Sequence, residues 1–133
     1  MKALIITDGT ESIQFIAQII KESLNGGGTN AKIKIKTTIC AAENFQGNEL
    51  LPTDIFFIGC EKSSPSSFKW LEDFLAHINL ASRKCGIFSV KAKSISYLKS
   101  ILKDSEADIG EPLLAETVKK ADVKKWIKQF IKG

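Results

Sequence analysis

Hydrophobic and polar positions along this chain follow two alternating patterns, one typical of buried strands and one of amphipathic helices. Ala3–Thr7, Asp54–Cys60 and Cys85–Val90 are almost continuously apolar, as in strands that are covered on both faces. Lysine alternates with isoleucine over Lys32–Thr37, which predicts a strand at a sheet edge with one exposed face. A short fifth strand is expected within Ala107–Ala115, where a glycine and a proline favour an edge position.

Apolar residues recur at helical spacing in the longer segments between and after these strands. The expected helices run from about Thr10 to Leu24, from the loop at 61–67 to Ile78, from Ser94 to Lys103 and from Ala121 to Lys132. Ser64 or Ser66 is expected to cap the second of these helices, with Pro65 near its first turn. A short helical turn is expected within residues 41–52.

Five strands that alternate with helices predict a parallel sheet with right-handed crossovers and helices on both faces. The three apolar strands belong in the middle of the sheet, and the two strands that contain lysines or glycine and proline belong at its edges. This arrangement favours the strand order 2-1-3-4-5. At 133 residues the chain is the size of one domain, so 1–133 is expected to form a single α/β domain. The crevice should then open between strands one and three, with Thr7–Ser12, Gly59–Trp70 and Ser89–Tyr97 as its lips.

The apolar runs and the cysteines narrow the class of protein. No apolar run approaches the roughly 18 residues that span a bilayer, and Asp8 stands where a signal peptide would be apolar, so no membrane association is expected. Cys40, Cys60 and Cys85 show no metal spacing, and His77 is the single histidine. We therefore expect reduced thiols in a cytoplasm and no metal site.

The chain is mildly basic, with a net charge of +4 and a sequence pI of about 9.0. Much of the excess lies in the last fifteen residues, where lysines recur every fourth residue on one side of the last helix: Lys120, Lys124, Lys128 and Lys132. Because the excess is small and arginines do not cluster, we interpret these lysines as a solvated face, and no nucleic-acid partner is expected.

The strand, turn and helix at the start of the chain form the strongest candidate for a binding site. The turn Thr7-Asp8-Gly9-Thr10-Glu11-Ser12 combines a glycine with several hydroxyls and leads into a helix N-terminus, which favours an anion. Two interpretations stay open at this point. A phosphate could bind beside Asp8, or Asp8 could cap the helix while Thr10 satisfies a backbone amide.

Over nearly its whole length, the sequence resembles the flavodoxin-like family. The resemblance rests on Lys2–Thr7 with Gly9-Thr10-Glu11, on Thr53–Gly59 followed by Pro65 and Trp70–Leu75, and on Arg83–Ser89. It implies a flavodoxin-like three-layer α/β/α sandwich with a five-stranded parallel sheet. It also implies non-covalent FMN binding, a role in electron transfer or flavin-dependent reduction, and a redox partner protein.

The same resemblance implies where FMN would lie, because the family holds the phosphate in the loop after the first strand and the ring between two later loops. Carried onto this chain, the implied cofactor-binding residues are Thr7, Asp8, Gly9, Thr10, Glu11, Ser12, Cys60, Ser63, Ser64, Trp70, Ser89, Val90 and Tyr97. Phe68 is a further aromatic candidate, and for all three aromatic residues packing within or beside helices is the alternative. Lys91 or Lys93 could supply a countercharge to the phosphate.

The chain departs from the family in its phosphate loop and in its charge. The family loop is T/S-x-T-G-x-T, whereas here Gly9 and Thr10 stand in swapped positions or, in another alignment, the loop is shorter. Asp8 and Glu11 place two carboxylates beside a site for a phosphate dianion, and like charges disfavour binding. Flavodoxins are also acidic and meet basic partners, whereas this chain is basic. Its electrostatic field would therefore have the opposite sign for docking to such partners.

Two other functions known for this strand order have weaker support. A receiver domain needs a phospho-accepting aspartate after the third strand, where this chain has Gly59-Cys60. Cys60 is placed where a nucleophile could work, but a low-molecular-weight phosphatase needs C-x5-R and Arg83 is the only arginine. We interpret Cys60 mainly as a small apolar residue of the core.

Two functions therefore stay open from the sequence. The first is an FMN-binding flavodoxin-like protein that takes part in electron transfer or flavin-dependent reduction. The second is a flavodoxin-fold module that has lost FMN and acts through protein contacts or another small ligand in the same crevice. No catalytic residue is assigned, and neither the oligomeric state nor enzymatic activity follows from the sequence.

Overall fold

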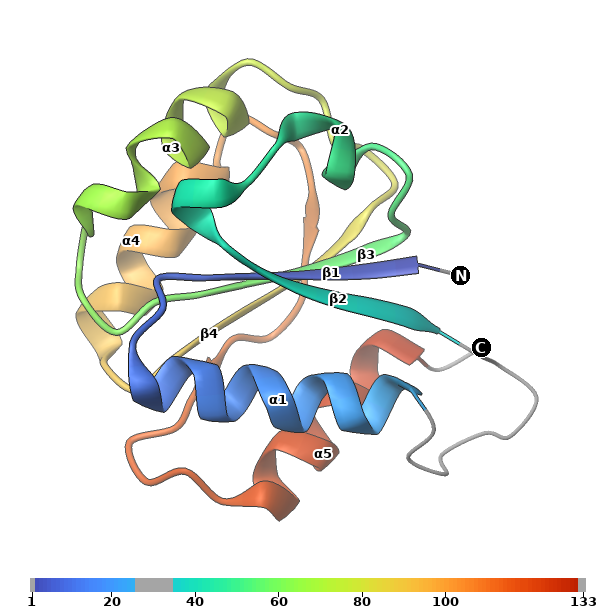
Figure 1. Ribbon diagram of the computed structural model, residues 1–133, viewed down its shortest axis with the longest axis vertical. Coiled ribbons are helices and arrows are strands. Elements are labelled where there is room, and N and C mark those ends of the chain that lie inside the picture. Colours follow the sequence, from blue (N-terminus) through green and yellow to red (C-terminus); the bar gives the residue numbers. More distant parts are fainter. Residues whose placement is uncertain (1, 26–34, 132–133) are drawn as a thin grey trace.

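The computed structural model describes residues 2–25 and 35–131, and its sheet is parallel throughout (Figure 1). The strands are β1 (Lys2–Thr7), β2 (Lys36–Ala41), β3 (Ile55–Gly59), β4 (Lys84–Ser89), β5 (Asp108–Ile109) and β6 (Leu113–Leu114). The helices are α1 (Glu11–Asn25), α2 (Gly47–Leu50), α3 (Lys69–Ala76), α4 (Ala92–Leu102) and α5 (Lys120–Ile131), with 3-10 turns η1 (Ala42–Asn44) and η2 (Ser66–Phe68). The strand order β2-β1-β3-β4-β5 confirms the predicted 2-1-3-4-5.

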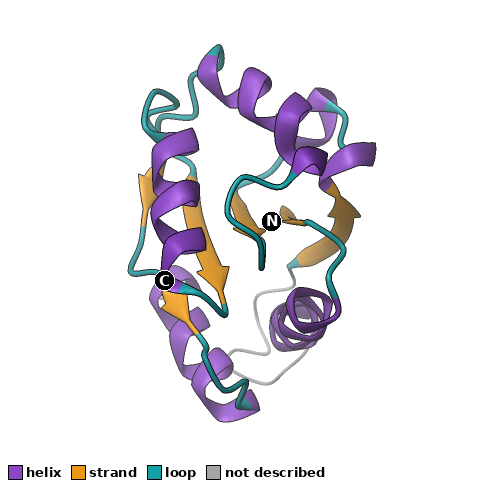
Figure 2. Ribbon diagram, turned by 90° about the vertical axis from the view of Figure 1, so that its left-hand side faces the viewer, coloured by secondary structure: helices purple, strands orange, loops and turns teal. Residues whose placement is uncertain are grey.

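Helices cover both faces of the sheet, which gives the predicted three layers (Figures 1 and 2). Successive side chains of a strand point to opposite faces. Ile5 and Phe57 therefore pack against α1 and α5, whereas Ile6 and Ile58 pack against α3 and α4. All four side chains are fully buried. Burial on both faces explains why the central strands are continuously apolar in the sequence.

The second strand lies further along the chain than predicted. Residues 32–34 of the expected strand Lys32–Thr37 lie outside the described residues, and β2 continues to Ala41. Its register with β1 runs from Lys2 opposite Lys36 to Thr7 opposite Ala41, so pairing with β1 determines its extent. Among the described strands β2 pairs with β1 alone, which confirms the edge position.

The expected fifth strand consists of two short segments, β5 and β6, that both pair with β4. Gly110, Glu111 and Pro112 interrupt it, and proline has no amide proton to donate to a sheet. This interruption is held against α5, because the carbonyl of Glu111 accepts hydrogen bonds from the Trp126 indole at 2.6 Å and from the Gln129 amide at 3.2 Å. The edge position is confirmed, and the expected short strand is divided into two segments.

The connection from β3 to α3 begins differently from the prediction. Ser64 has a left-handed backbone with φ of 53°. Pro65 occupies the N-cap position of η2 without a side-chain cap hydrogen bond, and α3 begins only at Lys69. The predicted serine cap is therefore wrong, although Pro65 does lie beside the first turn. The helical turn expected within residues 41–52 is confirmed by η1 and α2.

The carboxyl ends of β1, β3 and β4 lie along one edge of the sheet, at the left of Figure 1 and toward the viewer in Figure 2. The three connections that leave these strands lead into α1, α3 and α4 and meet at this edge. In the part of the chain that the structure describes, none of the helices has the length and apolar character needed to cross a membrane.

Candidate functional site

The turn between β1 and α1 is shaped by Thr7 and Gly9. The buried Thr7 hydroxyl donates to Oε1 of Gln14 at 3.1 Å and accepts the Gly9 amide at 3.3 Å. Gly9 has φ of 81°, a left-handed conformation that glycine adopts without strain. The carbonyl of Thr10 then accepts the Gln14 amide at 2.9 Å, so Thr10 stands at the start of α1. The first turn of α1 therefore points toward the carboxyl edge.

The half-buried Asp8 carboxylate is the centre of this edge. Its Oδ1 accepts the Thr10 amide at 3.1 Å and the Thr10 hydroxyl at 2.6 Å, and its Oδ2 accepts the Glu61 amide at 2.8 Å. Three donors from two connections thus converge on one anionic position before α1. Asp8 caps the turn that leads into α1, and the Thr10 hydroxyl serves Asp8.

Glu61 links all three connections at this edge. Its amide binds Asp8, its Oε1 accepts the Ser12 hydroxyl at 3.2 Å, and its carbonyl accepts the Ser94 hydroxyl at 2.6 Å. Glu61 and the fully buried Ser94 were not among the residues singled out from the sequence. The sequence did contain a signal for Glu61: it is a charged residue directly after the apolar run Asp54–Cys60. This places it at the edge where such sheets bind ligands.

Ser89 ties the end of β4 to the end of β3. Its buried hydroxyl donates to the Cys60 carbonyl at 2.6 Å and accepts the Lys91 amide at 3.1 Å. The structure therefore brings Ser89 and Cys60 together with the loop around Asp8, as the expected site requires. Ser89 acts here through its hydroxyl and Cys60 through its backbone carbonyl, and a role of either residue in binding stays a prediction.

The thiol of Cys60 is kept neutral by its surroundings. Burial, with a smaller contribution from the Asp8 charge, raises the pKa of Cys60 to about 12. Burial and then Glu49 raise the pKa of Cys40 to about 12, and burial raises the pKa of Cys85. A thiol that stays protonated is a poor nucleophile, which supports the interpretation of Cys60 as a core residue.

Trp70, Phe68 and Tyr97, the aromatic candidates, contact neighbouring elements of the fold, and Phe68 is fully buried. Trp70 is 50% exposed, and its indole donates to the carbonyl of Phe45 at 2.9 Å. The Tyr97 hydroxyl donates to Oε1 of Glu72 at 2.6 Å, which joins α4 to α3. Burial and this hydrogen bond raise the pKa of Tyr97, so its phenol stays protonated. For Trp70 and Tyr97 the structure shows the packing alternative rather than contact with the Asp8 loop.

The other predicted residues lie around the edge without forming its hydrogen-bonded centre. Glu11, Ser63 and Ser64 are exposed, whereas Val90 is half-buried and packs against the cluster beneath α1 and α5. Three carboxylates, those of Asp8, Glu11 and Glu61, belong to these connections. The exposed Lys91 and Lys93 follow β4 on the third connection.

The donor set around Asp8 suits an anion such as a phosphate. Two backbone amides and a hydroxyl point at one position before a helix N-terminus, which is the usual chemistry of phosphate binding. The Asp8 carboxylate holds that position, so a phosphate would have to displace it. Because Asp8 is only half-buried, its side chain has a route toward solvent.

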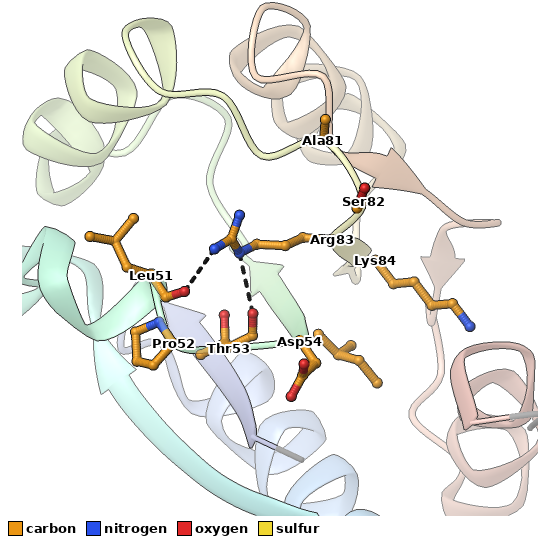
Figure 3. Close-up of a pocket in the computed structure, with 9 residues that line it drawn as sticks. Leu51, Pro52, Thr53, Asp54, Ala81, Ser82, Arg83 and Lys84 are labelled. Carbon is orange, nitrogen blue, oxygen red and sulfur yellow. Dashed lines mark hydrogen bonds between the residues drawn. The ribbon is translucent and has the colours of Figure 1, made fainter.

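A hollow of about 510 Å³ lies at the opposite edge of the sheet, between the segments that lead into β3 and β4 (Figure 3). Arg83 crosses it and donates to the carbonyl of Leu51 at 2.7 Å and to the carbonyl of Thr53 at 3.2 Å. These bonds use the guanidinium to hold two connections together. The hollow is thus separate from the edge that contains Asp8.

No family model matches the chain, and no curated protein matches its sequence. Among solved structures, a flavodoxin of Streptococcus pneumoniae TIGR4 is similar over 97% of this chain and 93% of its own, at 15% identity and a TM-score of 0.76. A short-chain flavodoxin associated with a non-canonical PDU bacterial microcompartment matches over 96% and 95%, at 12% identity and a TM-score of 0.78. A Fusobacterium nucleatum flavodoxin bound to flavin mononucleotide matches over 97% and 95%, at 13% identity and a TM-score of 0.69.

Proposed function

We propose that this chain, which has the flavodoxin-like fold, binds FMN at the carboxyl edge of its sheet and takes part in electron transfer. The observation that carries the proposal is the convergence of the Thr10 amide, the Thr10 hydroxyl and the Glu61 amide on one anionic position. The family resemblance implies that the FMN phosphate lies after the first strand, where this position is found. FMN, when bound, supplies the redox chemistry.

The residues of the chain would divide the work of binding. Thr10 and Glu61 would donate to the phosphate, and Asp8 would turn toward solvent. Gly9 keeps the approach open, since a β-carbon built on it meets no atom within 4 Å. Lys91 and Lys93 would reduce the local negative charge of Asp8, Glu11 and Glu61.

A flavin-free function is the second candidate, and one observation favours it. The Asp8 carboxylate already accepts the Glu61 amide, and Glu61 in turn accepts the hydroxyls of Ser12 and Ser94. A ligand gains little from donors that are already engaged, because binding then exchanges one set of hydrogen bonds for another. With this function, the protein would act through contacts with other proteins, and no flavin would bind at the carboxyl edge of the sheet.

The test is an absorption spectrum of the purified protein followed by an FMN titration monitored by flavin fluorescence. Flavin bands in the spectrum, or quenching with a Kd of about 1 µM or tighter, would support FMN binding; this affinity corresponds to about 8 kcal/mol. A colourless protein whose addition leaves FMN fluorescence unchanged at tens of micromolar would overturn it in favour of the flavin-free function.

A further inference from the structure

The hollow where β3 and β4 begin is formed by two connections that are far apart in the chain (Figure 3). One wall is the segment 51–55, which leads from α2 into β3, and the other is the segment 81–84, which leads into β4. Its volume of about 510 Å³ is within the range of roughly 300–1,000 Å³ that is typical of small-molecule sites. The hollow therefore has room for a small ligand.

The guanidinium of Arg83 is held in this hollow by only one of its two forks. Nε donates to the Thr53 carbonyl at 3.2 Å, and Nη2 donates to the Leu51 carbonyl at 2.7 Å. These two nitrogens lie on the same side of the planar group, which carries five N–H donors in a fixed geometry. The second fork, formed by Nη1 and the remaining N–H of Nη2, has no hydrogen-bond partner among residues 2–25 and 35–131. One terminal nitrogen of Arg83 accordingly carries no dashed line in Figure 3.

The positive charge of Arg83 also lacks a counterion. In the part of the chain that the structure describes, no carboxylate oxygen lies within 4 Å of the guanidinium. Asp54 lines the hollow, but its carboxylate accepts the Lys2 amide at 3.0 Å and points away from the guanidinium in Figure 3. Lys84 lines the same hollow, so the lining carries two positive charges and one negative charge. This balance favours an anionic ligand.

The donors in the hollow suit a carboxylate better than a phosphate. Phosphate sites are usually built from several free backbone amides. Here five backbone amides of the two walls already donate to other groups of the chain: Thr53, Asp54, Ala81, Arg83 and Lys84. A single guanidinium fork, by contrast, matches the two oxygens of one carboxylate. Leu51 and Pro52 are exposed and offer an apolar surface to the rest of the ligand.

We propose that this hollow binds a small monocarboxylate with a branched apolar group, through the free fork of Arg83. The hydrogen bonds to the carbonyls of Leu51 and Thr53 fix the guanidinium before the ligand arrives, which reduces the entropy lost on binding. The apolar group of the ligand would lie against Leu51 and Pro52. The hollow is at the opposite edge of the sheet from Asp8, so the proposal does not depend on FMN.

An NMR titration of the isotopically labelled full chain tests this site. The probe is 3-methylbutanoate, and the control is 3-methylbutanamide, which has the same shape without the charge. We expect the probe to shift the amide signals of residues 51–55 and 81–84 and the Nε–H signal of Arg83. Because Arg83 is only half-buried, the shifts should saturate with a Kd of about 1 mM. The control amide should produce no such shifts.

The lysines of α5 serve as an internal control for non-specific attraction of anions. The described members of the predicted solvated face are all exposed: Lys120, Lys124 and Lys128. The amide signals along α5 should therefore stay in place while those of the hollow move. Equal shifts in both regions, or no saturating shift at residues 51–55 and 81–84, would overturn the proposal.

Two variants of the hollow separate the fork from the charge. Arg83→Lys keeps the charge but removes the fork, so it should weaken the binding of 3-methylbutanoate at least about tenfold. Lys84→Gln removes a neighbouring charge but keeps the fork, so its affinity should fall by less than about threefold. Urea denaturation would show that both variants are folded. Unchanged affinity in a folded Arg83→Lys variant would contradict the assigned role of the fork.

A second pair of variants tests the same fork in a chain that keeps Arg83. The carboxylate of Leu51→Asp would belong to the residue whose carbonyl binds Nη2, and it would compete with the probe for the free fork. Leu51→Asn has nearly the same shape without the charge, so it should bind the probe at least about tenfold more tightly than Leu51→Asp. Equal affinities in this pair would overturn the proposal. Inorganic phosphate that binds more tightly than 3-methylbutanoate would overturn the choice of a carboxylate.

Discussion

The Glu61 amide donates to the Asp8 carboxylate at 2.8 Å, and this bond joins the ends of two paired strands. Thr7 and Gly59, the last residues of β1 and β3, lie opposite each other in the sheet. The crevice that the strand order creates between β1 and β3 is therefore bridged by a carboxylate of the chain itself. Whether a ligand phosphate can replace that carboxylate decides between the two proposed functions.

Asp8→Asn should increase the affinity for FMN about tenfold, because a negative charge is removed from the place of the phosphate dianion. Fluorescence titration measures the change. The same variant should lose roughly 1 kcal/mol of unfolding free energy, since the hydrogen bond from Glu61 loses its charged acceptor. Asp54→Asn makes the same chemical change at the opposite edge, where Asp54 accepts the Lys2 amide, and should leave FMN affinity unaltered. An unchanged or lower affinity of Asp8→Asn would contradict this placement of the phosphate.

Ser89→Ala should destabilise the fold by about 1–3 kcal/mol, because it leaves the Cys60 carbonyl and the Lys91 amide without their buried partner. Urea denaturation measures the loss. Ser100→Ala is the matched control: its hydroxyl also donates to a carbonyl at 2.6 Å, that of Tyr97, but on the exposed side of α4. We expect a change within about 0.5 kcal/mol there. Similar losses in both variants would show that burial of Ser89 is not the cause.

Gly59→Ala should cost about 2–3 kcal/mol, because the added β-carbon would overlap the ring of the fully buried Phe88. Gly9→Ala meets no neighbouring atom within 4 Å but must adopt φ of 81°, so a loss of about 1 kcal/mol is expected. Thermal melting would rank the two. A larger loss at Gly9 would mean that backbone conformation, rather than packing, limits substitution at this edge.

The stability of the protein should fall as the pH rises above 9. The pKa of Cys60 is raised from 9.0 to about 12 in the folded state, so between these values the unfolded state releases the proton more readily. This contribution is fully present below pH 9 and is lost as the pH approaches 12. Cys60→Ala should therefore show a shallower alkaline decline than the natural protein when urea midpoints are measured from pH 8 to 11. Parallel declines would contradict the assigned pKa.

The sequence predicted the candidate edge better than the contacts within it. Asp8, Gly9 and Thr10 were identified because a turn between an apolar strand and a helix has few conformational solutions. Glu61 and Ser94 were missed, because their roles depend on connections that are far apart in sequence and meet only at the edge of the folded sheet. Trp70 and Tyr97 were uncertain for the same reason, since Phe45 and Glu72 come from other elements.

Local patterns determined the layers, the strand order and the helices of this protein. Continuous apolar runs can only be buried on both faces, and helical periodicity specifies which side of each helix meets the sheet. Tertiary pairing alone decided where β2 ends and how the fifth strand divides, because the register with β1 and β4 sets those limits. Tertiary structure also decided that the Asp8 carboxylate faces the Glu61 amide, since a hydrogen bond across 53 residues depends on the folded sheet rather than on local sequence.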